Sequence, residues 1–147
     1  MNGVKEGNMT LKEMVNQVGQ DSYGLERTPL MAAAYEEHFQ LVKYLIEQGE
    51  ADPNIADSEF GSNALHFAAL NNRTNTELIE LLLAHMTLNS INKKDRGGST
   101  PLDFAYRRNH SPIQQEIIAL LRSKGGKANY HDANGRNVGA GNGDLND

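Results

Sequence analysis

One pattern of residues occurs three times along this chain, and it restricts the fold more than any other feature. A short run of small and apolar residues begins at Thr28, Asn63 and Thr100, and each run is typical of a closely packed helix. A second apolar helix is predicted after each run, followed by polar turn residues. Matching aspartates in the turns, Asp57 and Asp95, are about 38 residues apart. Because so short a helix pair cannot bury its apolar side chains alone, the pattern predicts a stack of similar units.

Several local signals place the helices within these units. Thr74, with Glu77 three residues later, has the pattern of a capping box and predicts that the second helix of the middle unit begins there. Thr28 and Thr100 each precede a proline, which favours a helix start because proline has no backbone N–H to leave unbonded. Tyr106 replaces an alanine of the earlier units, so we expect it to shield the end of the stack.

These units resemble the ankyrin repeats, a family with a period of about 33 residues, a Thr-Pro-Leu-His signature and a β-turn between helix pairs. Thr28–Leu30 and Thr100–Leu102 match the first part of that signature, and His66 stands at its histidine position. Met31 and Asp103 replace the histidine in the flanking units. The resemblance covers most of the chain. It implies an all-α ankyrin-repeat solenoid of stacked helix-turn-helix units joined by β-hairpin-like turns.

The N-terminal segment has a helix signal of its own. Thr10 and Glu13 form a capping box, and the helix that they start is predicted to continue to Val18. Leu11, Met14 and Val18 share one face of this helix. Since the terminal units of solenoids are atypical caps, we expect this helix to cover the open end of the first repeat.

The predicted domain organisation has three parts. Residues 1–20 form a flexible start and the cap helix, and residues 139–147 form a disordered tail rich in Gly and Asn, with too little apolar surface to offset the entropy of ordering. The ankyrin-repeat domain between them, residues 21–138, is divided into repeats at about 21–56, 57–94 and 95–131 and a partial hairpin at 132–138, which we expect to fold against the third repeat.

Composition excludes several classes of protein. There is no cysteine among the 147 residues, so a disulfide framework and a thiolate zinc site are impossible. No apolar run approaches the roughly 18 residues of a membrane span, and the first 19 residues lack the apolar centre of a signal peptide. The net charge of −5 argues against nucleic acid as the main partner. We therefore expect a monomer of the cytoplasm that does not associate with membranes, with export to another compartment left open.

No combination of residues suggests catalysis or a cofactor. No two of the five histidines stand at a metal-ligand spacing, and no nucleophile elbow is present. The resemblance implies that His66 and His110 bond to backbone atoms in the turns, and that His38 has the same role as His110. Residues 139–145 are faintly similar to a calcium-binding repeat, but that architecture needs several stacked copies. We therefore expect no enzyme activity, no metal and no cofactor.

The resemblance implies a concave binding side made of hairpin tips and the ends of the inner helices. Tyr23, Tyr35 and Phe60 are aromatic residues that the fold does not require, and tyrosine and arginine are enriched among interface hot spots. The alternative is that Phe60 packs on its own hairpin and Tyr23 on the end cap. The residues predicted to contact a partner are Tyr23, Leu25, Arg27, Tyr35, Glu36, Glu59, Phe60, Leu70, Asn71, Arg96, Arg107 and Arg108.

Charge is distributed unevenly between the two ends of the predicted stack. Residues 21–59 contain nine acidic and two basic residues, whereas residues 93–127 contain eight basic and three acidic residues. Such a gradient can steer a charged partner, although chance and solubility explain it equally well. The sequence thus predicts a non-catalytic protein–protein interaction module that binds a peptide or protein in its concave groove. The alternative is an accessory, targeting or regulatory subunit of a larger assembly whose activity lies elsewhere.

Overall fold

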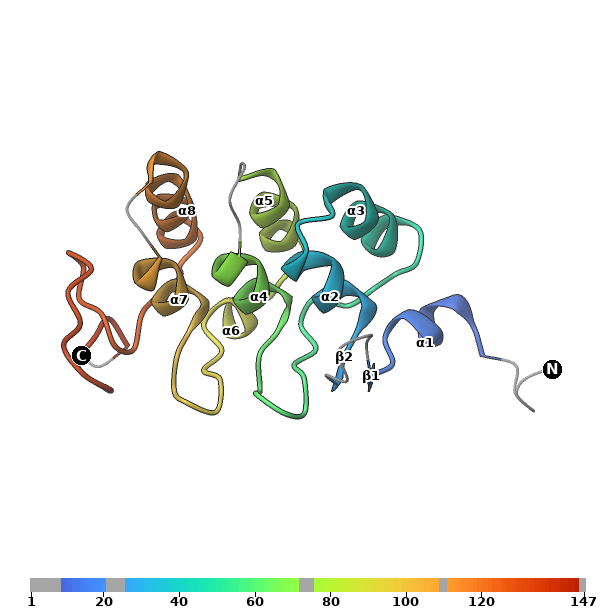
Figure 1. The fold of residues 1–147 in the computed structure, drawn as a ribbon, viewed down its shortest axis with the longest axis horizontal. Helices are drawn as coiled ribbons and strands as arrows, with labels where there is room; N and C mark the ends of the chain where they lie inside the picture. The colour runs from blue at the N-terminus through green and yellow to red at the C-terminus, as the bar shows by residue number, and fades with distance from the viewer. Residues whose placement is uncertain (1–8, 21–25, 72–75, 109–110, 146–147) are drawn as a thin grey trace.

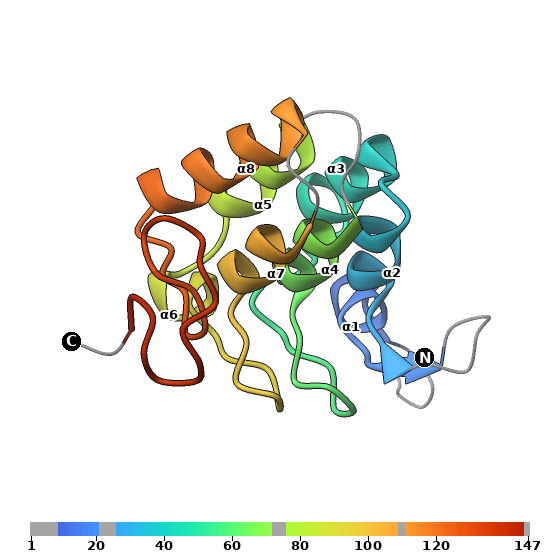
Figure 2. The same ribbon diagram turned by 60° about the vertical axis from the view of Figure 1, so that its left-hand side comes forward.

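The described part of the chain is a row of three helix pairs followed by a hairpin and a packed tail (Figure 1). This computed structural model describes residues 9–20, 26–71, 76–108 and 111–145. The first, inner helices of the pairs lie side by side in one layer, and the second, outer helices form another layer (Figure 2). The inner helices are α2 (Pro29–Tyr35), α4 (Ala64–Asn71) and α7 (Pro101–Arg107), and the outer helices are α3 (Phe39–Glu47), α5 (Glu77–Ala84) and α8 (Pro112–Ser123). The predicted all-α solenoid is therefore confirmed.

Four short elements complete the described structure. They are α1 (Leu11–Val15), β1 (Gly19–Gln20), β2 (Glu26–Arg27) and α6 (Leu88–Ile91). β1 and β2 pair antiparallel ahead of the first helix pair. α6 was not predicted, and its N-cap is Thr87, whose hydroxyl accepts a hydrogen bond from the backbone N–H of Ser90 at 3.2 Å. None of the described helices has the length and apolar character needed to cross a lipid bilayer.

The inner helices start as their sequences predict. The hydroxyls of Thr28 and Thr100 accept hydrogen bonds from the backbone N–H groups three residues later, and a proline occupies the first turn in both helices. In the middle repeat, Oδ1 of Asn63 replaces the threonine hydroxyl and accepts from the N–H of Leu65 at 3.0 Å. Each cap satisfies a backbone donor that the helix itself cannot bond.

The hydrophobic core runs through the stack from repeat to repeat. Leu30, Leu65 and Leu102 occupy the same position in α2, α4 and α7, and all three are fully or almost fully buried. Buried alanines such as Ala34 and Ala69 accompany them, and their small side chains let adjacent inner helices pack closely, α2 against α4 and α4 against α7. The periodic pattern of the sequence thus corresponds to the interfaces between repeats.

Asparagine side chains join each unit to the next. Asn92 ends α6, and its Nδ2 donates to the carbonyl of Gly125 at 3.0 Å while its Oδ1 accepts from the N–H of Lys127 at 2.6 Å. Asn16 ends α1 and makes the same pair of bonds with the backbone of residues 50–52, at 3.2 and 2.7 Å. We call these contacts the asparagine bridges. They show that α1 joins the first complete pair in the way that α6 joins the segment after α8.

Two helix predictions need correction. The capping box of Thr10 and Glu13 is confirmed, but α1 ends at Val15, and Val15 is its buried side chain. The face of Leu11, Met14 and Val18 is 40–52% exposed, so the helix covers the first repeat through Val15 and Asn16 and not through that face. Because successive residues of a helix are about 100° apart, a neighbouring position presents a different face.

The start of the second helix in the middle repeat also differs from its prediction. α5 begins at Glu77, and Thr76 is its N-cap but makes no side-chain capping bond. Thr74, the predicted cap, lies outside the described residues. Since Glu77 is itself the first helical residue, it does not occupy the third position that a capping box requires.

The prediction of a disordered tail is wrong for residues 139–145. The N–H groups of Gly141 and Gly143 donate to the carbonyl of Asn129 at 3.1 Å, and the N–H of Leu145 donates to the carbonyl of Ala128 at 3.0 Å. The carboxylate of Asp144 lies 2.6 Å from the Arg122 guanidinium. Backbone hydrogen bonds and one ion pair therefore order this polar segment without a large apolar area.

The partial fourth hairpin packs against the third repeat as expected. Asp132 and Arg136 pair through a backbone hydrogen bond of 3.0 Å that closes the turn. The Tyr106 ring lies 5.4 Å from that of His131, and the Arg122 guanidinium donates to the Tyr106 hydroxyl at 3.2 Å. Tyr106 thus shields the C-terminal end of the stack, in agreement with the prediction.

We expect Gly143→Ala to lower the free energy of unfolding by about 1–3 kcal/mol, the usual cost of forcing extra atoms into a packed site. A Cβ at Gly143 would lie 2.7 Å from the carbonyl oxygens of Ala128 and His131. The matched control is Gly97→Ala, where the nearest atom would be 3.5 Å away. Urea unfolding followed by circular dichroism measures both, and an unchanged Gly143→Ala protein would show that the tail does not pack here.

Candidate partner-binding surface

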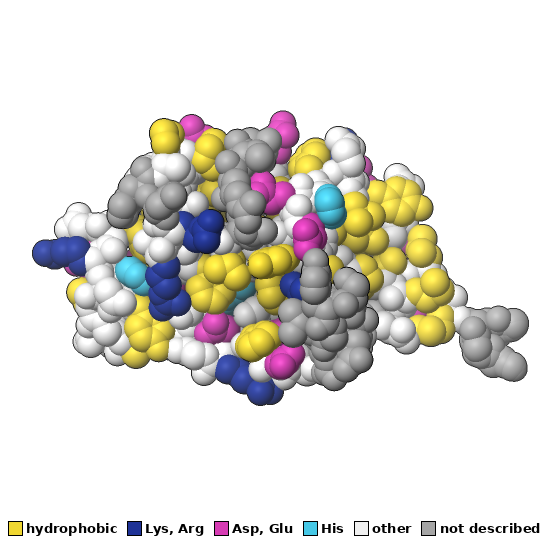
Figure 3. All heavy atoms as spheres, viewed as in Figure 1, with side chains coloured by type: hydrophobic (Ala, Val, Ile, Leu, Met, Phe, Trp, Pro, Cys, Tyr) yellow, Lys and Arg dark blue, Asp and Glu magenta, His cyan; other side chains and the backbone are white. Residues whose placement is uncertain are grey.

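The inner helices present the same positions in each repeat, so their side chains form rows across the stack. One row is Tyr35, Leu70 and Arg107, each seven residues after the N-terminal cap position of its unit. A second row contains Phe67 and Phe104, each four residues after that position. We call the surface made by these rows and the hairpin tips the inner face. Figure 3 shows hydrophobic side chains gathered in the middle of the molecule over α4 and α7, with basic side chains next to them.

At the N-terminal end of the inner face, a cation lies between two aromatic rings. The guanidinium carbon of Arg27 is 5.3 Å from the centre of the Tyr35 ring and 5.2 Å from that of Phe67. The two rings meet edge to face at 6.3 Å. Arg27 is only 6% exposed, so the cation–π contacts take the place of much of its hydration. Arg27 and Tyr35, both predicted site residues, are therefore also part of the packing between repeats.

A similar arrangement occurs at the C-terminal end of the inner face. The Arg107 guanidinium carbon lies 5.7 Å from the Phe104 ring centre and 5.1 Å from that of Tyr130. Phe104 is supported from below by an edge contact with the His66 ring at 5.4 Å. Unlike Arg27, Arg107 is exposed to solvent. This end of the face therefore offers a positioned cation to a binding partner.

The hairpin tip of the middle repeat presents Phe60, whose side chain is 48% exposed. The Phe60 carbonyl accepts a hydrogen bond from the N–H of Arg96 at 2.9 Å, and the Arg96 guanidinium donates to the carbonyl of Ser58 at 2.6 Å. Gly61, which directly follows Phe60, has a φ of 69°, a conformation that favours glycine. Neighbouring hairpins are thus bonded to one another, and this contact holds the half-exposed ring in place.

The other predicted site residues have mixed surroundings. Glu36 and Glu59 are exposed, Leu70 is 38% exposed and Arg108 is partly exposed. Asn71 is the last residue of α4. Tyr23 and Leu25 lie outside the described residues.

Three aromatic residues of the inner face were missed from the sequence, namely Phe67, Phe104 and Tyr130. Phe67 and Phe104 were not singled out from the sequence as site residues. Their shared position in consecutive repeats was the available signal, since equal positions in stacked inner helices become neighbours. Tyr130 gave no such signal, because its contact with Arg107 depends on how the fourth hairpin folds back.

His66 has the structural role that the resemblance implies. The backbone N–H of Asn63 donates to Nδ1 of His66 at 3.1 Å, so Nε2 carries the proton and donates to the carbonyl of Ser99 at 3.1 Å. Burial lowers the pKa of His66 to about 4, although the hydrogen bond to Ser99 opposes this shift. A neutral histidine therefore joins the second repeat to the third.

Asp103 replaces this histidine in the last repeat. Its side chain accepts hydrogen bonds from the following segment, whereas His66 donates one. Its buried carboxylate accepts hydrogen bonds from the N–H groups of Asn129 and Tyr130, both at 2.8 Å, and from Nδ1 of His131 at 2.8 Å. Burial alone raises the pKa of Asp103, but the hydrogen bonds from His131 and the backbone outweigh it and hold the pKa below its usual value. The Asp103 carboxylate, an acceptor at the position of a histidine donor, thus anchors the fourth hairpin.

The remaining predicted histidine role is not seen. His38 is exposed, and as the N-cap of α3 it makes no side-chain capping bond. His110 lies outside the described residues. Within the described ranges, no group of three or more His, Asp and Glu side chains is arranged to hold a metal ion.

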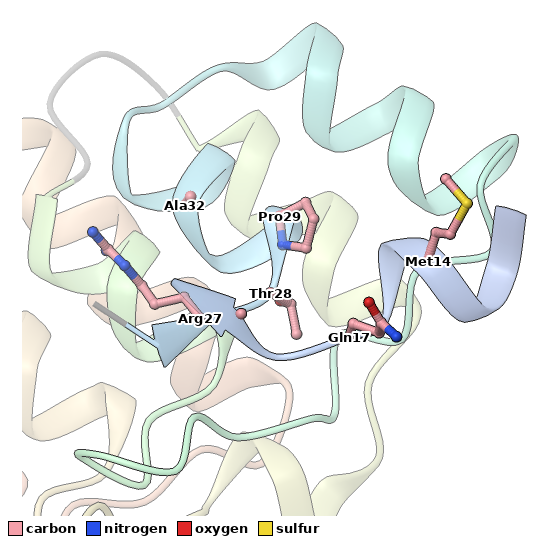
Figure 4. Close-up of a pocket in the computed structure, with 7 residues that line it drawn as sticks. Met14, Gln17, Arg27, Thr28, Pro29 and Ala32 are labelled. Atoms are coloured by element: carbon pink, nitrogen blue, oxygen red, sulfur yellow. The ribbon is translucent and has the colours of Figure 1, made fainter. Parts of the chain in front are cut away.

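A separate hollow of about 260 Å³ lies between α1 and the start of α2 (Figure 4). Met14, Gln17, Pro29 and Ala32 line it, and Arg27 borders it while its side chain extends away towards α4. Arg27 is its one charged lining residue in the described part of the chain. The hollow therefore lacks the paired titrating groups that acid–base catalysis requires.

Comparison with known proteins agrees with this geometry. The family described as "Ankyrin repeats (3 copies)" matches residues 1–85 and 49–134, which together cover most of the chain. The chain belongs to the ankyrin-repeat family. Ankyrin repeats are generally non-catalytic modules of protein–protein interaction, and they typically bind protein partners.

Three relatives illustrate how widely this ankyrin-repeat sequence is shared. "Zinc finger CCCH domain-containing protein 47" of Arabidopsis thaliana is 34% identical over 74% of this chain and 19% of its own length. "Transient receptor potential cation channel subfamily A member 1" of Homo sapiens is 32% identical over 73% and 9%. "NAD-dependent deacetylase sir2B" of Dictyostelium discoideum is 31% identical over 76% and 14%. The chain thus spans less than a fifth of these relatives, and their names differ too much to indicate one activity.

Proposed function

We propose that this ankyrin-repeat protein is a non-catalytic module that binds an extended peptide or protein segment across its inner face. The main support is the run of partly exposed side chains Tyr35, Leu70, Phe104 and Tyr130, which crosses all three repeats. A partner lying along this run can contact every repeat at once. Aromatic side chains and arginines are enriched among interface hot spots.

The charge distribution gives such a partner a direction. Glu36 and Glu59 are exposed in the first half of the inner face, and Arg96 and Arg107 are exposed in the second half. Charges of this kind mainly accelerate encounter and fix orientation, whereas apolar anchors supply most of the affinity. The bound segment is therefore expected to lie along the long axis of the stack in one orientation.

Affinity capture from native cell lysate tests this proposal, with Phe60→Ala/Leu70→Ala as the variant of the inner face. Both side chains are substantially exposed, so the double substitution should change thermal stability little. We expect the captured partner to dissociate about tenfold faster or more from the variant, as measured by surface plasmon resonance.

The matched control is Leu41→Ala/Tyr44→Ala. These residues lie on the outer helix α3 and are exposed to a similar extent, 46% and 54%. If the partner binds the inner-face variant as tightly as the wild type but not the α3 variant, the partner uses the outer helices and the proposed surface is wrong.

A second candidate function is that of an accessory, targeting or regulatory subunit of a larger assembly. The observation that favours it is the small share of each relative that this ankyrin-repeat chain spans. Native size-exclusion chromatography of the lysate distinguishes the candidates. A stable subunit should elute almost entirely within one larger complex, whereas a module with transient partners should elute mainly near its monomer size.

A further inference from the structure

The basic charge of the third repeat reaches the inner face through three arginines. Arg96 lies at a hairpin tip, and Arg107 and Arg108 lie at the C-terminal end of α7. Among the described residues, none of the three has a carboxylate within ion-pair distance. The nearby carboxylate of Asp103 is buried and is occupied by the fourth hairpin. This part of the inner face therefore carries positive charge that the carboxylates of the described residues do not neutralise.

Arg107 is the best positioned of these cations. Its guanidinium packs on both the Phe104 and the Tyr130 ring, so much of its side-chain freedom is already restricted before a partner binds. A planar guanidinium donates two parallel hydrogen bonds to a carboxylate, a geometry that an ammonium group does not provide. Leu70 belongs to the same row one repeat away, and its apolar side chain is 38% exposed.

We infer that the segment bound by the inner face carries an aspartate or glutamate beside an aliphatic or aromatic residue. The acidic side chain binds Arg107, with Arg108 adding charge, and the apolar side chain packs on Leu70 and Phe104. This inference rests on the proposed function and specifies the chemistry of its ligand. Figure 3 shows the arrangement, with hydrophobic side chains over α4 and α7 and basic side chains beside them.

A carboxylate fits this site better than the phosphates of a nucleic acid. Exposed Glu36 and Glu59 lie on the same face, and the chain as a whole has a net charge of −5. A polyanion that follows the groove would be repelled by the acidic half, because phosphate backbones bind through extended positive surfaces. A peptide with a single acidic position avoids that repulsion.

Phage display of random 12-residue peptides on the full-length immobilised protein tests the inference. We expect the selected peptides to share an Asp or Glu next to an aromatic or aliphatic residue. A synthetic peptide of the best sequence should bind Arg107→Glu/Arg108→Glu at least about tenfold more weakly than the wild type in fluorescence anisotropy. Replacing the acidic residue of the peptide by lysine should weaken wild-type binding and restore binding to the variant.

The matched control is Lys124→Glu/Lys127→Glu, which makes the same change in net charge at exposed residues just beyond α8. We expect its affinity for the peptide to stay within about twofold of wild type, since exposed charges are screened over about 10 Å at 0.1 M salt. Equal weakening by the two charge reversals would show a general charge effect and overturn the assignment to Arg107.

Failure of this inference differs from failure of the proposed function. Selected peptides that have no acidic preference, bind the Arg107→Glu/Arg108→Glu protein normally and lose affinity for Phe60→Ala/Leu70→Ala would overturn only the acidic ligand. Peptides that bind both variants as tightly as wild type would overturn the inner face as well. Displacement of the peptide by a 12-nucleotide single-stranded RNA would favour a nucleic-acid ligand and also overturn the inference.

Discussion

Leu65→Ala is expected to lower the free energy of unfolding by about 2–5 kcal/mol, the range seen when a fully buried leucine is truncated. Leu65 has no exposed surface and lies in α4, which packs against α2 on one side and α7 on the other. The cavity would therefore open at the centre of the stack. The three inner helices can close it only in part, because adjacent repeats hold each other at a fixed separation.

Urea unfolding followed by circular dichroism measures this effect, and Leu70→Ala is the matched control. Leu70 is in the same helix and loses the same atoms, but it is 38% exposed, so its loss should stay below about 1 kcal/mol. A Leu65→Ala protein that loses no more than the Leu70→Ala protein would show that Leu65 does not belong to the core.

Acidification from pH 6.5 to pH 4 is expected to destabilise the protein by about 3 kcal/mol through His66 alone. The folded state holds the pKa of His66 at about 4, against 6.5 for an unperturbed histidine. Between these values the unfolded chain binds a proton that the folded chain does not, so the free energy of unfolding falls as the pH falls. The loss is absent above pH 6.5 and complete near pH 4.

The measurement is the free energy of unfolding at several pH values for the wild type and for His66→Gln, which cannot titrate in this range. The difference in the free energy of unfolding between the wild type and His66→Gln should narrow as the pH falls from 6.5 to 4. The control is His85→Gln at an exposed position, whose free energy of unfolding should follow that of the wild type. NMR titration of the folded wild type reads the pKa of His66 directly if His66→Gln is too unstable. A pKa of His66 near 6.5 would contradict the expectation.

The sequence predicts those parts of the fold that depend on periodicity. Leu30, Leu65 and Leu102 repeat at a nearly constant spacing, and all three are buried in the structure. Prediction from the sequence fails where order depends on polar contacts between distant segments. Residues 139–145 have a disordered composition, but their backbone groups pair with Ala128 and Asn129, and composition does not report such pairing.

In the candidate surface, too, the residues that follow from periodicity were predicted and those that depend on contacts between distant segments were not. The row of Tyr35, Leu70 and Arg107 follows from repeat alignment, and those three residues were predicted. Tyr130 was not predicted, because it reaches Arg107 only after the fourth hairpin has folded against the third repeat. The exposed face of α1 was also mispredicted, since a helix of five residues gives too short a pattern to fix which side is buried.

The asparagine bridges allow this architecture to change in length by duplication. The bridging bonds of Asn16 and Asn92 all end on backbone atoms of the following unit, so these bonds do not depend on the side chains of that unit. If a unit between two such asparagines were copied or deleted, its new neighbour would still offer one backbone carbonyl and one backbone N–H to the asparagine. Duplication could therefore change the number of repeats without changing the asparagine bridges, because the bonds of these bridges end on backbone atoms that every sequence supplies.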